Sequence, residues 1–388
     1  MPLPNNFNKP MPTIDAILAD EFPVARKLIY LNHAAVAPWP ARTAQAVQGF
    51  AQRCLESGAQ HYRDWEQAEQ GLREQLAVLI HAGSAEDIAL LKSTSEALSV
   101  VSQGFPWRAG DNVVICAEEF PSNRIVWEAL ADRGVTVRPV PVQGAPDPEQ
   151  ELLTAFDART RLLAVSSVQY AAGLRLDLAR LGEACARRGV AFCVDAIQGL
   201  GAVPHDVGAM RIDFLMADAH KWLLGPEGVA VFYCRPEWRE RLALHQFGWR
   251  MVEDPLNFER RDWQPAASAR RFECGSPNML GIHACAASLS LLLEIGADRT
   301  EQRILERSEY LFDSIARAPQ LELITDKRRG RYAGIVAFRH RELPSPALFQ
   351  RLLAHDVICS QRGGGIRFAP HCYNRLEDLE RALRYCTA

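Results

Sequence analysis

Short apolar runs alternate with amphipathic stretches through the middle of the chain. The apolar runs predict strands at 88–91, 112–116, 136–142, 162–168, 191–195 and 229–234. Apolar side chains at helical spacing predict helices in the intervals, beginning near 92 and spanning about 122–133, 149–156 and 177–187. Because strand and helix alternate, the pattern favours an α/β fold with a mostly parallel sheet covered on both faces.

The flanking regions have a different pattern. Two amphipathic helices, 41–59 and 64–82, precede the alternating region, and a short strand at 28–31 precedes them. Residues 245–269 are rich in Trp, Pro and Arg with little periodicity, which predicts a crossing between domains. Mixed helices and strands follow, typical of a smaller α+β domain. We therefore predict a segment 1–27 that packs with the small domain, a large domain 28–260 and a small domain 261–388.

Composition narrows the classes of function. At 388 residues the chain is long enough for two unequal domains. Lys and Arg number 44 against 47 Asp and Glu, a formal net charge of −3, and the absence of a dense basic run argues against a nucleic-acid partner. With neither a stretch of about 20 apolar residues nor a secretion signal, no membrane partner is expected, and the cytoplasm is the default location.

Two common cofactor classes find no support. The ten cysteines lie scattered in apolar segments without a C-x-x-C pair, so they are predicted to be buried hydrophobic residues and no metal site is expected. No strand-to-helix turn carries G-x-G-x-x-G, which counts against a nicotinamide dehydrogenase.

Residues 191–235 carry the main chemical signal. Asp195 ends an apolar run, Gln198 follows it, and His220-Lys221 stand between two further apolar runs. A lysine amine can form a Schiff base with the aldehyde of pyridoxal 5'-phosphate, while a carboxylate keeps the pyridine nitrogen protonated. Lys221 and Asp195 match these roles at the strand ends where α/β sheets build sites. Either residue alone reads equally well as a helix cap or a solvated loop residue.

The combined pattern V-D-x-x-Q, D-F-L-x-x-D-x-H-K-W and G-P-x-G-V-A resembles the class V aminotransferase family of pyridoxal-phosphate enzymes, which includes cysteine desulfurases, kynureninase and isopenicillin N epimerase. The likeness extends from about Tyr30 to the C-terminus. It implies fold type I, with a large domain built on a mixed, mostly parallel sheet. It also implies that Gln198 contacts the cofactor's phenolic oxygen, rather than capping a helix, and that His220 contacts the cofactor at its phosphate, rather than packing in a turn.

The resemblance implies cofactor contacts at two further turns. Thr94 and Ser95 begin a predicted helix, where free N–H groups can cradle a phosphate or a hydroxyl can simply cap the helix; the family favours phosphate contact. Phe120 lies in Glu118–Asn123, where the desulfurases place a histidine that stacks on the pyridine ring. Phenylalanine can supply the stacking face but cannot move a proton.

Three polar residues are candidate contacts on weaker grounds. Ser167 and Gln169 follow a strand near a position where the family uses asparagine, so Ser167 could reach the cofactor and Gln169 the substrate. The alternative is that both are buried and hydrogen-bonded. His33 lies in an Asn-His-Ala-Ala turn that the resemblance places near the active site, as a substrate contact or as part of a plain loop.

Two motifs near the end of the chain concern assembly and substrate. Gly275 and Ser276 belong to F-E-C-G-S-P, which resembles an F-E-x-G-T-P turn that reaches the cofactor phosphate of a neighbouring subunit, implying a homodimer; a turn with a helix cap is the alternative. Arg367 begins R-x-x-x-x-x-Y-N, which resembles the family position that binds the substrate carboxylate.

The absence of a cysteine ahead of Arg367 narrows the predicted reaction. A desulfurase needs a thiolate on the loop ahead of the carboxylate-binding arginine, yet no cysteine lies between Ser360 and Arg367, and Cys359 and Cys372 are predicted to pack in the core. We expect an enzyme that acts on a small amino acid through Lys221, a class V aminotransferase or desulfurase-like lyase. Transamination and β-elimination rank above epimerisation of the isopenicillin type. A non-catalytic binding protein with this fold is the other alternative.

Overall fold

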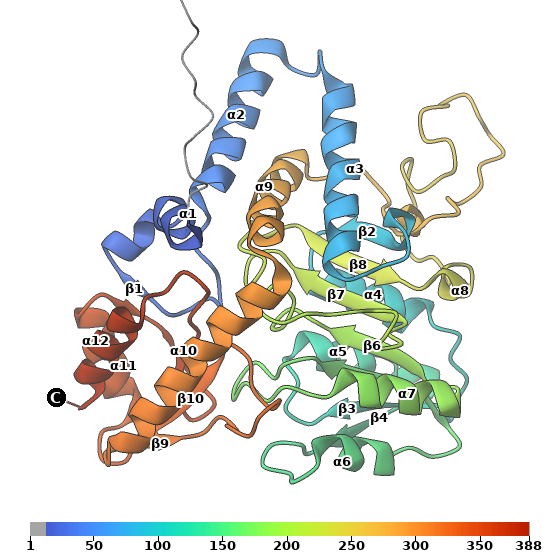
Figure 1. The fold of residues 1–388 in the computed structure, drawn as a ribbon. Coiled ribbons are helices and arrows are strands. Elements are labelled where there is room, and N and C mark those ends of the chain that lie inside the picture. The colour runs from blue at the N-terminus through green and yellow to red at the C-terminus, as the bar shows by residue number, and fades with distance from the viewer. Residues whose placement is uncertain (1–12, 388) are drawn as a thin grey trace, which may run out of the picture.

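A seven-stranded mixed sheet forms the centre of the computed structural model, which describes residues 13–387 (Figure 1). The strand order is β2-β8-β7-β6-β5-β3-β4; β3 to β7 run parallel, while β8 and β2 are antiparallel to their neighbours. The predicted α/β class is therefore confirmed. The strands are β2 Ile88–Leu91, β3 Asn112–Cys116, β4 Thr136–Val140, β5 Thr160–Ser166, β6 Ala191–Asp195, β7 Phe214–Asp218 and β8 Ala230–Cys234.

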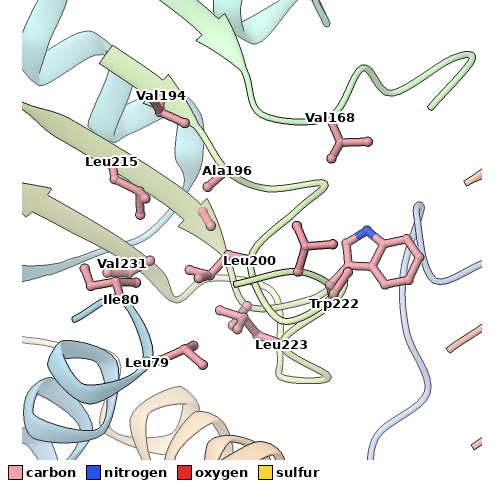
Figure 2. Packing of buried hydrophobic residues seen from close by; sticks show 14 of the residues in the cluster. Leu79, Ile80, Val168, Val194, Ala196, Leu200, Leu215, Trp222, Leu223 and Val231 are labelled. Atoms are coloured by element: carbon pink, nitrogen blue, oxygen red, sulfur yellow. The ribbon is translucent and has the colours of Figure 1, made fainter. Parts of the chain in front are cut away.

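Helices cover both faces of this sheet, because its central strands are apolar on both sides. In β6, Phe192 and Val194 join one buried cluster while Ala191 and Cys193 join another. The first cluster, part of which is seen in Figure 2, packs under α2 Ala41–Ser57, α3 Tyr62–Leu79, α6 Pro148–Thr154, α7 Leu178–Arg188 and α9 Met279–Ile295. The second packs under α4 Thr94–Gly104, α5 Ser122–Glu128 and α8 Pro236–Arg239.

The C-terminal part builds a second, antiparallel sheet. Its order is β12-β13-β10-β9, and its strands are β9 Leu321–Leu323, β10 Val336–His340, β12 Ser360–Arg362 and β13 Gly365–Phe368. The helices of this part are α10 Ala297–Arg317, α11 Ser345–Ala354 and α12 Leu376–Thr387.

The beginning of the chain lies with this C-terminal part. Strand β1, Ile29–Tyr30, pairs in parallel with β11, Val357–Ile358, and the preceding helix α1 spans Ile14–Glu21. We predicted that residue 28 opens the large domain, whereas the pairing of β1 joins it to the end of the chain. The division near residue 260 stays a prediction, and residues 1–12 of the predicted N-terminal segment lie outside the described residues.

Two segments differ from the sequence prediction. Residues 245–269, where we predicted a crossing between domains, form an excursion closed by a bridge between Val252 and Pro265; it leaves after α8 and returns beside β2 (Figure 1). The β12–β13 hairpin was not predicted, because its residues 360–365 contain no apolar run. Gly363 and Gly364 make its turn, with φ of 63° and 80°, which glycine adopts without a steric penalty.

Within residues 13–387, no single helix is both long and apolar enough to cross a membrane, and α9 and α10 reach that composition only as a pair bent by 83°.

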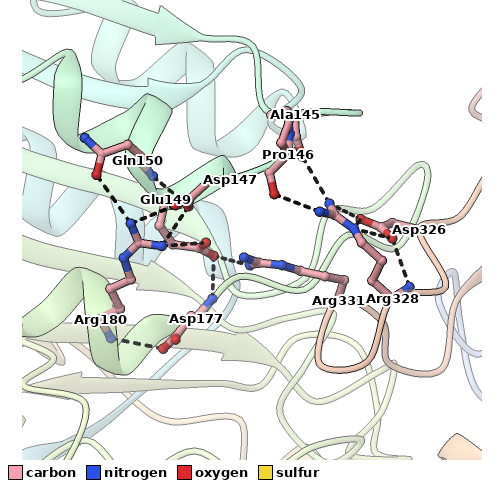
Figure 3. Close-up of polar contacts among 10 residues, drawn as sticks. All are labelled: Ala145, Pro146, Asp147, Glu149, Gln150, Asp177, Arg180, Asp326, Arg328 and Arg331. Atoms are coloured by element: carbon pink, nitrogen blue, oxygen red, sulfur yellow. Dashed lines mark hydrogen bonds and ion pairs between the residues drawn. The ribbon is translucent and has the colours of Figure 1, made fainter.

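A buried carboxylate links the large sheet to the C-terminal part (Figure 3). Glu149 has no exposed surface, and its Oε1 accepts hydrogen bonds from the Asp177 backbone N–H at 2.7 Å and from Arg331 Nη1 at 2.5 Å. Nearby, Arg328 donates to the carbonyl oxygens of Ala145 and Pro146. The start of α6 is thereby fastened to the loop before β10.

Replacing Glu149 with alanine is expected to lower the free energy of unfolding by about 3 kcal/mol, because Arg331 and a backbone N–H lose their acceptor in a buried place. Urea unfolding followed by circular dichroism measures the change. Glu151→Ala, an exposed position on the same helix, is the matched control. Equal stabilities for the two variants would contradict this role for Glu149.

Candidate active site

Three carboxylates meet at one edge of the central sheet. Glu119 follows β3, and Asp195 and Asp218 are the last residues of β6 and β7. Because β3, β5, β6 and β7 are parallel, their carboxyl ends open at the same edge, where α/β proteins usually bind ligands. The sheet topology thus gathers side chains that are up to 99 positions apart in the sequence, counting from 119 to 218.

A tightly anchored turn presents Lys221 at this edge. Leu224 has φ of 60°, the Gly225 N–H donates to the Ala219 carbonyl oxygen at 2.8 Å, and the indole of Trp222 is fully buried. Figure 2 shows Trp222 and Leu223 just beyond the strands that carry Val194 and Leu215. The apolar residues on either side of Lys221 fix the backbone, so the lysine is the polar residue that the turn directs to the site.

Lys221 is a buried amine. Its residue is 9% exposed, and within the described chain its Nζ makes no hydrogen bond. Burial, with a smaller contribution from the charge of Arg367, lowers its pKa to about 8, against the opposing effects of Asp195 and Asp218. A larger fraction of the amine is therefore uncharged near neutral pH than in a free lysine, which suits a nucleophile or a base.

The reactivity of Lys221 in the apoprotein is expected to rise with pH around a midpoint near 8, because only the uncharged amine is nucleophilic. The check is the initial rate of modification by an amine-directed reagent between pH 6 and about 11, read at Lys221 by peptide mass spectrometry. Exposed Lys327 serves as comparison in the same sample. A midpoint near the free-lysine value of about 10.4 would contradict the burial argument.

Asp195 is buried beside this amine. It is 1% exposed and accepts the Ile197 N–H at 3.0 Å through Oδ1. Burial raises its pKa, the negative charges of Glu119 and Asp218 raise it too, and the charge of Lys221 lowers it. Among the residues described, Asp195 accepts this one hydrogen bond through Oδ1, so its carboxylate is suited to face a cationic nitrogen.

Glu119 is a site residue to which sequence reasoning gave no role. It is 5% exposed and accepts hydrogen bonds from the Ser166 N–H at 2.7 Å, Gln169 Nε2 at 2.9 Å and Asn123 Nδ2 at 3.0 Å, with a further short bond from the Ser166 hydroxyl. Burial raises the pKa of Glu119, and its four donors oppose that rise. Two adjacent acids, Glu118 and Glu119, are typical of a solvent-exposed loop, so the sequence did not indicate that Glu119 is buried. The turn before Pro121, at the end of a strand, was the one sequence feature that pointed to the site.

The start of α4 is organised differently from the prediction. The helix cap is Ser93, whose hydroxyl accepts the Glu96 N–H at 3.1 Å, rather than Thr94 or Ser95. Thr94 exchanges two hydrogen bonds with Asp218, from its N–H to Oδ2 at 3.1 Å and to its Oγ1 from the Asp218 N–H at 3.0 Å. Ser95 is exposed in the first turn, and its hydroxyl donates to Ser122 at 2.8 Å. Thr94 therefore fixes α4 to β7, and Ser95 is the freer of the two.

His220 and Phe120 are two further residues close to Lys221, one with an unpartnered ring nitrogen and one with a partly exposed ring. His220 Nδ1 is buried without a hydrogen-bond partner, and burial together with Lys221 lowers its pKa to about 4, so the ring is neutral at pH 7. The Phe120 ring centroid lies 5.7 Å from Lys221 Nζ and packs edge-on against Tyr170 at 5.2 Å. Phe120 remains 41% exposed, which leaves a ring face available for stacking.

Arg367 is a buried guanidinium on β13. It is 3% exposed. Among residues 13–387 its guanidinium donates to one acceptor, the Tyr170 carbonyl oxygen, 2.6 Å from Nη1, and its Nε has no hydrogen-bond partner. Burial lowers its pKa to about 10, with a further contribution from Arg362. A buried arginine without a carboxylate is costly, so this position favours an anionic ligand.

Three predicted contacts have surroundings that the sequence did not indicate. His33 is fully buried, and its ring nitrogens bond the Ala369 carbonyl oxygen at 2.7 Å and Tyr373 at 2.9 Å, so it has no capacity left for substrate. Ser167 points to the opposite face of the sheet from Asp195: a Cβ added to Gly199 would lie 2.5 Å from its Oγ. Gln198 donates to the Ala34 carbonyl oxygen at 2.9 Å and accepts from Trp222 at 3.0 Å, which leaves one amide hydrogen for a ligand.

The Gly275–Ser276 turn stands apart from Lys221 in this chain. It lines a hollow of about 260 Å³ with Lys92 and Glu96 at the start of α4. Glu273, just before it, is held by Arg73 through bonds of 2.6 Å and 2.8 Å in a buried network with Glu69 and Arg250. The backbone that leads into the Gly275–Ser276 turn is thus held in place by this network.

The unused polar groups of the site are those that a phosphorylated pyridine aldehyde requires. Gln169 Oε1, His220 Nδ1 and Arg367 Nε are buried without partners, and the Lys221 amine makes no hydrogen bond in the described chain. Asp195 adds a buried carboxylate and Phe120 an open ring face. An amine, a carboxylate, a neutral imidazole nitrogen, an amide acceptor, a guanidinium donor and an aromatic face together fit pyridoxal phosphate and an anionic substrate group.

Comparison with known proteins gives a consistent result. A family model described as aminotransferase class-V matches residues 29–385. An uncharacterized aminotransferase YcbU of Bacillus subtilis is 30% identical over 87% of this chain and 88% of its own length. A probable cysteine desulfurase of Methanothermobacter thermautotrophicus is 28% identical, with 93% and 94% covered. The solved complex of the cystine C-S lyase C-DES with cysteine persulfide has a similar fold, with a TM-score of 0.87, 23% identity and 94% of this chain covered against 98% of that chain.

Proposed function

This chain belongs to the class V aminotransferase family of pyridoxal-phosphate-dependent enzymes, and from that membership we propose that it acts on a small α-amino acid by proton chemistry at Lys221. The proposal rests on two groups of the same site: a buried, partly uncharged amine at Lys221 and a buried guanidinium at Arg367 whose Nε has no hydrogen-bond partner in the described chain. The first is suited to accept a proton and the second to hold a carboxylate.

The cofactor, when bound, supplies an electron sink that stabilises negative charge at the substrate's α-carbon. The residues proposed to hold it are Asp195 at the pyridine nitrogen, Phe120 at the ring face, and Thr94, Ser95 and His220 at the phosphate. Gln198 offers one amide hydrogen. Since Thr94 is already bonded to Asp218, we assign more of the phosphate contact to Ser95 and His220.

Substrate orientation is assigned to Arg367 and Gln169. A guanidinium group binds a carboxylate with two parallel hydrogen bonds, and Arg367 Nε has no other hydrogen-bond partner among the described residues, so it can make one of them. Gln169 is held through its Nε2 by Glu119, so its Oε1 is directed and free to accept a donor on the substrate or cofactor. Glu119 acts here as a positioning residue.

The arrangement favours one-base chemistry. Lys221 can take the α-proton and return it elsewhere, whereas Phe120, which faces it, cannot supply a proton to the other side of the substrate. We therefore rank transamination and β-elimination above two-base epimerisation.

A persulfide route through a thiol next to Arg367 has no support. The β12–β13 turn carries glycines where a nucleophilic cysteine would stand. Cys359 is 4% exposed and Cys372 fully buried, and burial raises the pKa of each thiol to about 12. Both are buried packing residues that are poor nucleophiles, so neither is proposed to accept sulfur from the substrate.

We further propose a cytoplasmic homodimer in which the Gly275–Ser276 turn reaches the neighbouring site. The turn is rigid, lies away from Lys221 of its own chain and borders a hollow at the start of α4. The family resemblance of F-E-C-G-S-P supports the contact.

The experiment that tests the function is a panel of amino acids incubated with the holoenzyme, with keto acid, sulfide, ammonia and loss of optical activity measured for each. Keto acid production in the presence of an amino acceptor would indicate transamination, and ammonia or sulfide without an acceptor would indicate elimination. Loss of optical activity alone would favour the epimerase alternative. If none of these products forms, the assignment to a small amino acid fails.

A further inference from the structure

A second concave site lies away from Lys221, between α1, α10 and α12. Its volume is about 770 Å³, within the range of roughly 300–1,000 Å³ that small-molecule sites occupy. In Figure 1 these three helices lie together on the side of the molecule opposite α7 and α8. The cations that line the cavity are Arg26, Lys27, Arg303, Arg307, Arg375 and Arg381, against two acids, Asp15 and Asp356.

Arg307 is the buried centre of this cluster. It is 6% exposed, its Nε donates to the Asn374 carbonyl oxygen at 2.7 Å, and Nη1 donates to the Arg303 carbonyl oxygen at 2.6 Å. The nearest carboxylate oxygen, on Glu306, is 3.7 Å from Nη1, and within residues 13–387 Nη2 donates no hydrogen bond. Burial and the charge of Arg303 lower its pKa. A buried guanidinium whose hydrogen bonds go only to carbonyl oxygens, with one half-exposed carboxylate at 3.7 Å, is incompletely neutralised.

The surrounding cations are incompletely neutralised. Arg303 pairs with Asp15 at 2.6 Å, but the Asp15 side chain is 77% exposed and so screened by water. Arg375 and Arg381 share one carboxylate, Asp378, at 2.9 Å and 3.2 Å. The cavity therefore holds an excess of positive charge around a buried guanidinium.

We propose that this cavity binds a small organic anion with more than one negative charge. Guanidinium groups from two helices suit a ligand that presents several anionic oxygens at once. Aromatic walls give room for an apolar body: Phe22 stacks on Tyr373 with centroids 3.8 Å apart, and His355 stacks on Tyr385 at 4.1 Å. Phosphate esters and polycarboxylates share this chemistry.

The cavity is connected to the interior behind the active-site turn. Arg303 and Arg307 bond the carbonyl oxygens of Cys372 and Asn374, and Tyr373 bonds His33 Nε2 at 2.9 Å. In the same turn, His371 contacts the Trp222 carbonyl oxygen at 3.2 Å. An anion bound at Arg307 would thus steady the turn that supports Trp222, so binding is expected to raise the melting temperature of the holoenzyme.

The test is calorimetric titration of the holoenzyme with inorganic pyrophosphate and, separately, with citrate at low ionic strength, while the cofactor absorbance is followed. We expect saturable binding of at least one anion, weakened about tenfold by Arg381→Gln and more by Arg307→Met, as for the loss of charge-assisted hydrogen bonds. Arg317→Gln, which removes the same charge from an exposed position on α10 outside the cavity, is the control. If Arg307→Met does not fold, Lys27→Gln with Arg381→Gln decides.

Binding of pyrophosphate alone would identify a phosphate-bearing ligand, and binding of citrate alone a polycarboxylate. The proposal is overturned if neither anion binds at millimolar concentration, or if Arg317→Gln weakens binding as much as Arg381→Gln. It is also overturned if binding removes the cofactor absorbance, since the anion would then occupy the Lys221 site.

Discussion

Lys221→Ala is expected to lower kcat by at least about 10³-fold, because a positioned general base contributes roughly 10²–10⁴-fold and we also propose this lysine as the covalent link to the cofactor. Borohydride reduction of the wild-type holoenzyme is expected to fix the cofactor to the peptide that contains Lys221. The variant is expected to bind the cofactor without such fixation. Absorbance, peptide mass spectrometry and turnover measure the three effects.

The matched control is Lys327→Ala, which removes an exposed lysine and should leave all three measurements unchanged. Loss of fold is not expected in Lys221→Ala, since the change removes a partly charged group from a buried place and keeps Trp222 and Leu223, which anchor the turn. Turnover of the variant within about tenfold of wild type would show that another group moves the proton.

The central fold followed from the sequence because one physical rule determined it. Strands such as β3 and β6 are buried on both faces, so they appear as continuous apolar runs that need helices on each side. The same rule placed Asp195 and Lys221 at the carboxyl edge of the sheet. Family likeness supplied the cofactor, and the match over residues 29–385 bears it out.

The parts that sequence could not supply depend on which way a side chain points. Ser166 and Ser167 are neighbours of the same type, yet alternation along β5 turns Ser166 to Glu119 and Ser167 to the opposite face. Glu119 carries no sequence mark of burial, because its four donors come from residues up to 50 positions away. His33 could not be assigned, since its partners Ala369 and Tyr373 belong to the other end of the chain.

Arg367→Lys is expected to lower kcat/KM for the amino-acid substrate by about 10²–10³-fold. Each hydrogen bond to a charged group contributes about 1.5–3 kcal/mol, and an ammonium cannot reproduce the two-pronged geometry of the guanidinium. The wild-type enzyme should strongly prefer an α-amino acid over the amine that lacks its carboxylate, and the variant should lose most of this preference. Arg362→Lys, on the exposed strand of the same hairpin, is the control. An undiminished preference in Arg367→Lys would place the carboxylate elsewhere.

Removing the charge altogether gives a second, independent measurement. Because Arg367 lowers the pKa of Lys221, Arg367→Met should raise that pKa above its value of about 8. The sign follows from repulsion: without the guanidinium, the ammonium form of Lys221 is less disfavoured and survives to higher pH. In the apoprotein, the midpoint of Lys221 modification should therefore move to higher pH in Arg367→Met and stay in place in Arg367→Lys, where a positive charge remains. A midpoint that is the same in Arg367→Met as in the wild type would mean that the two cations are too well separated or screened to interact, and that burial without Arg367 accounts for the lowered pKa of Lys221.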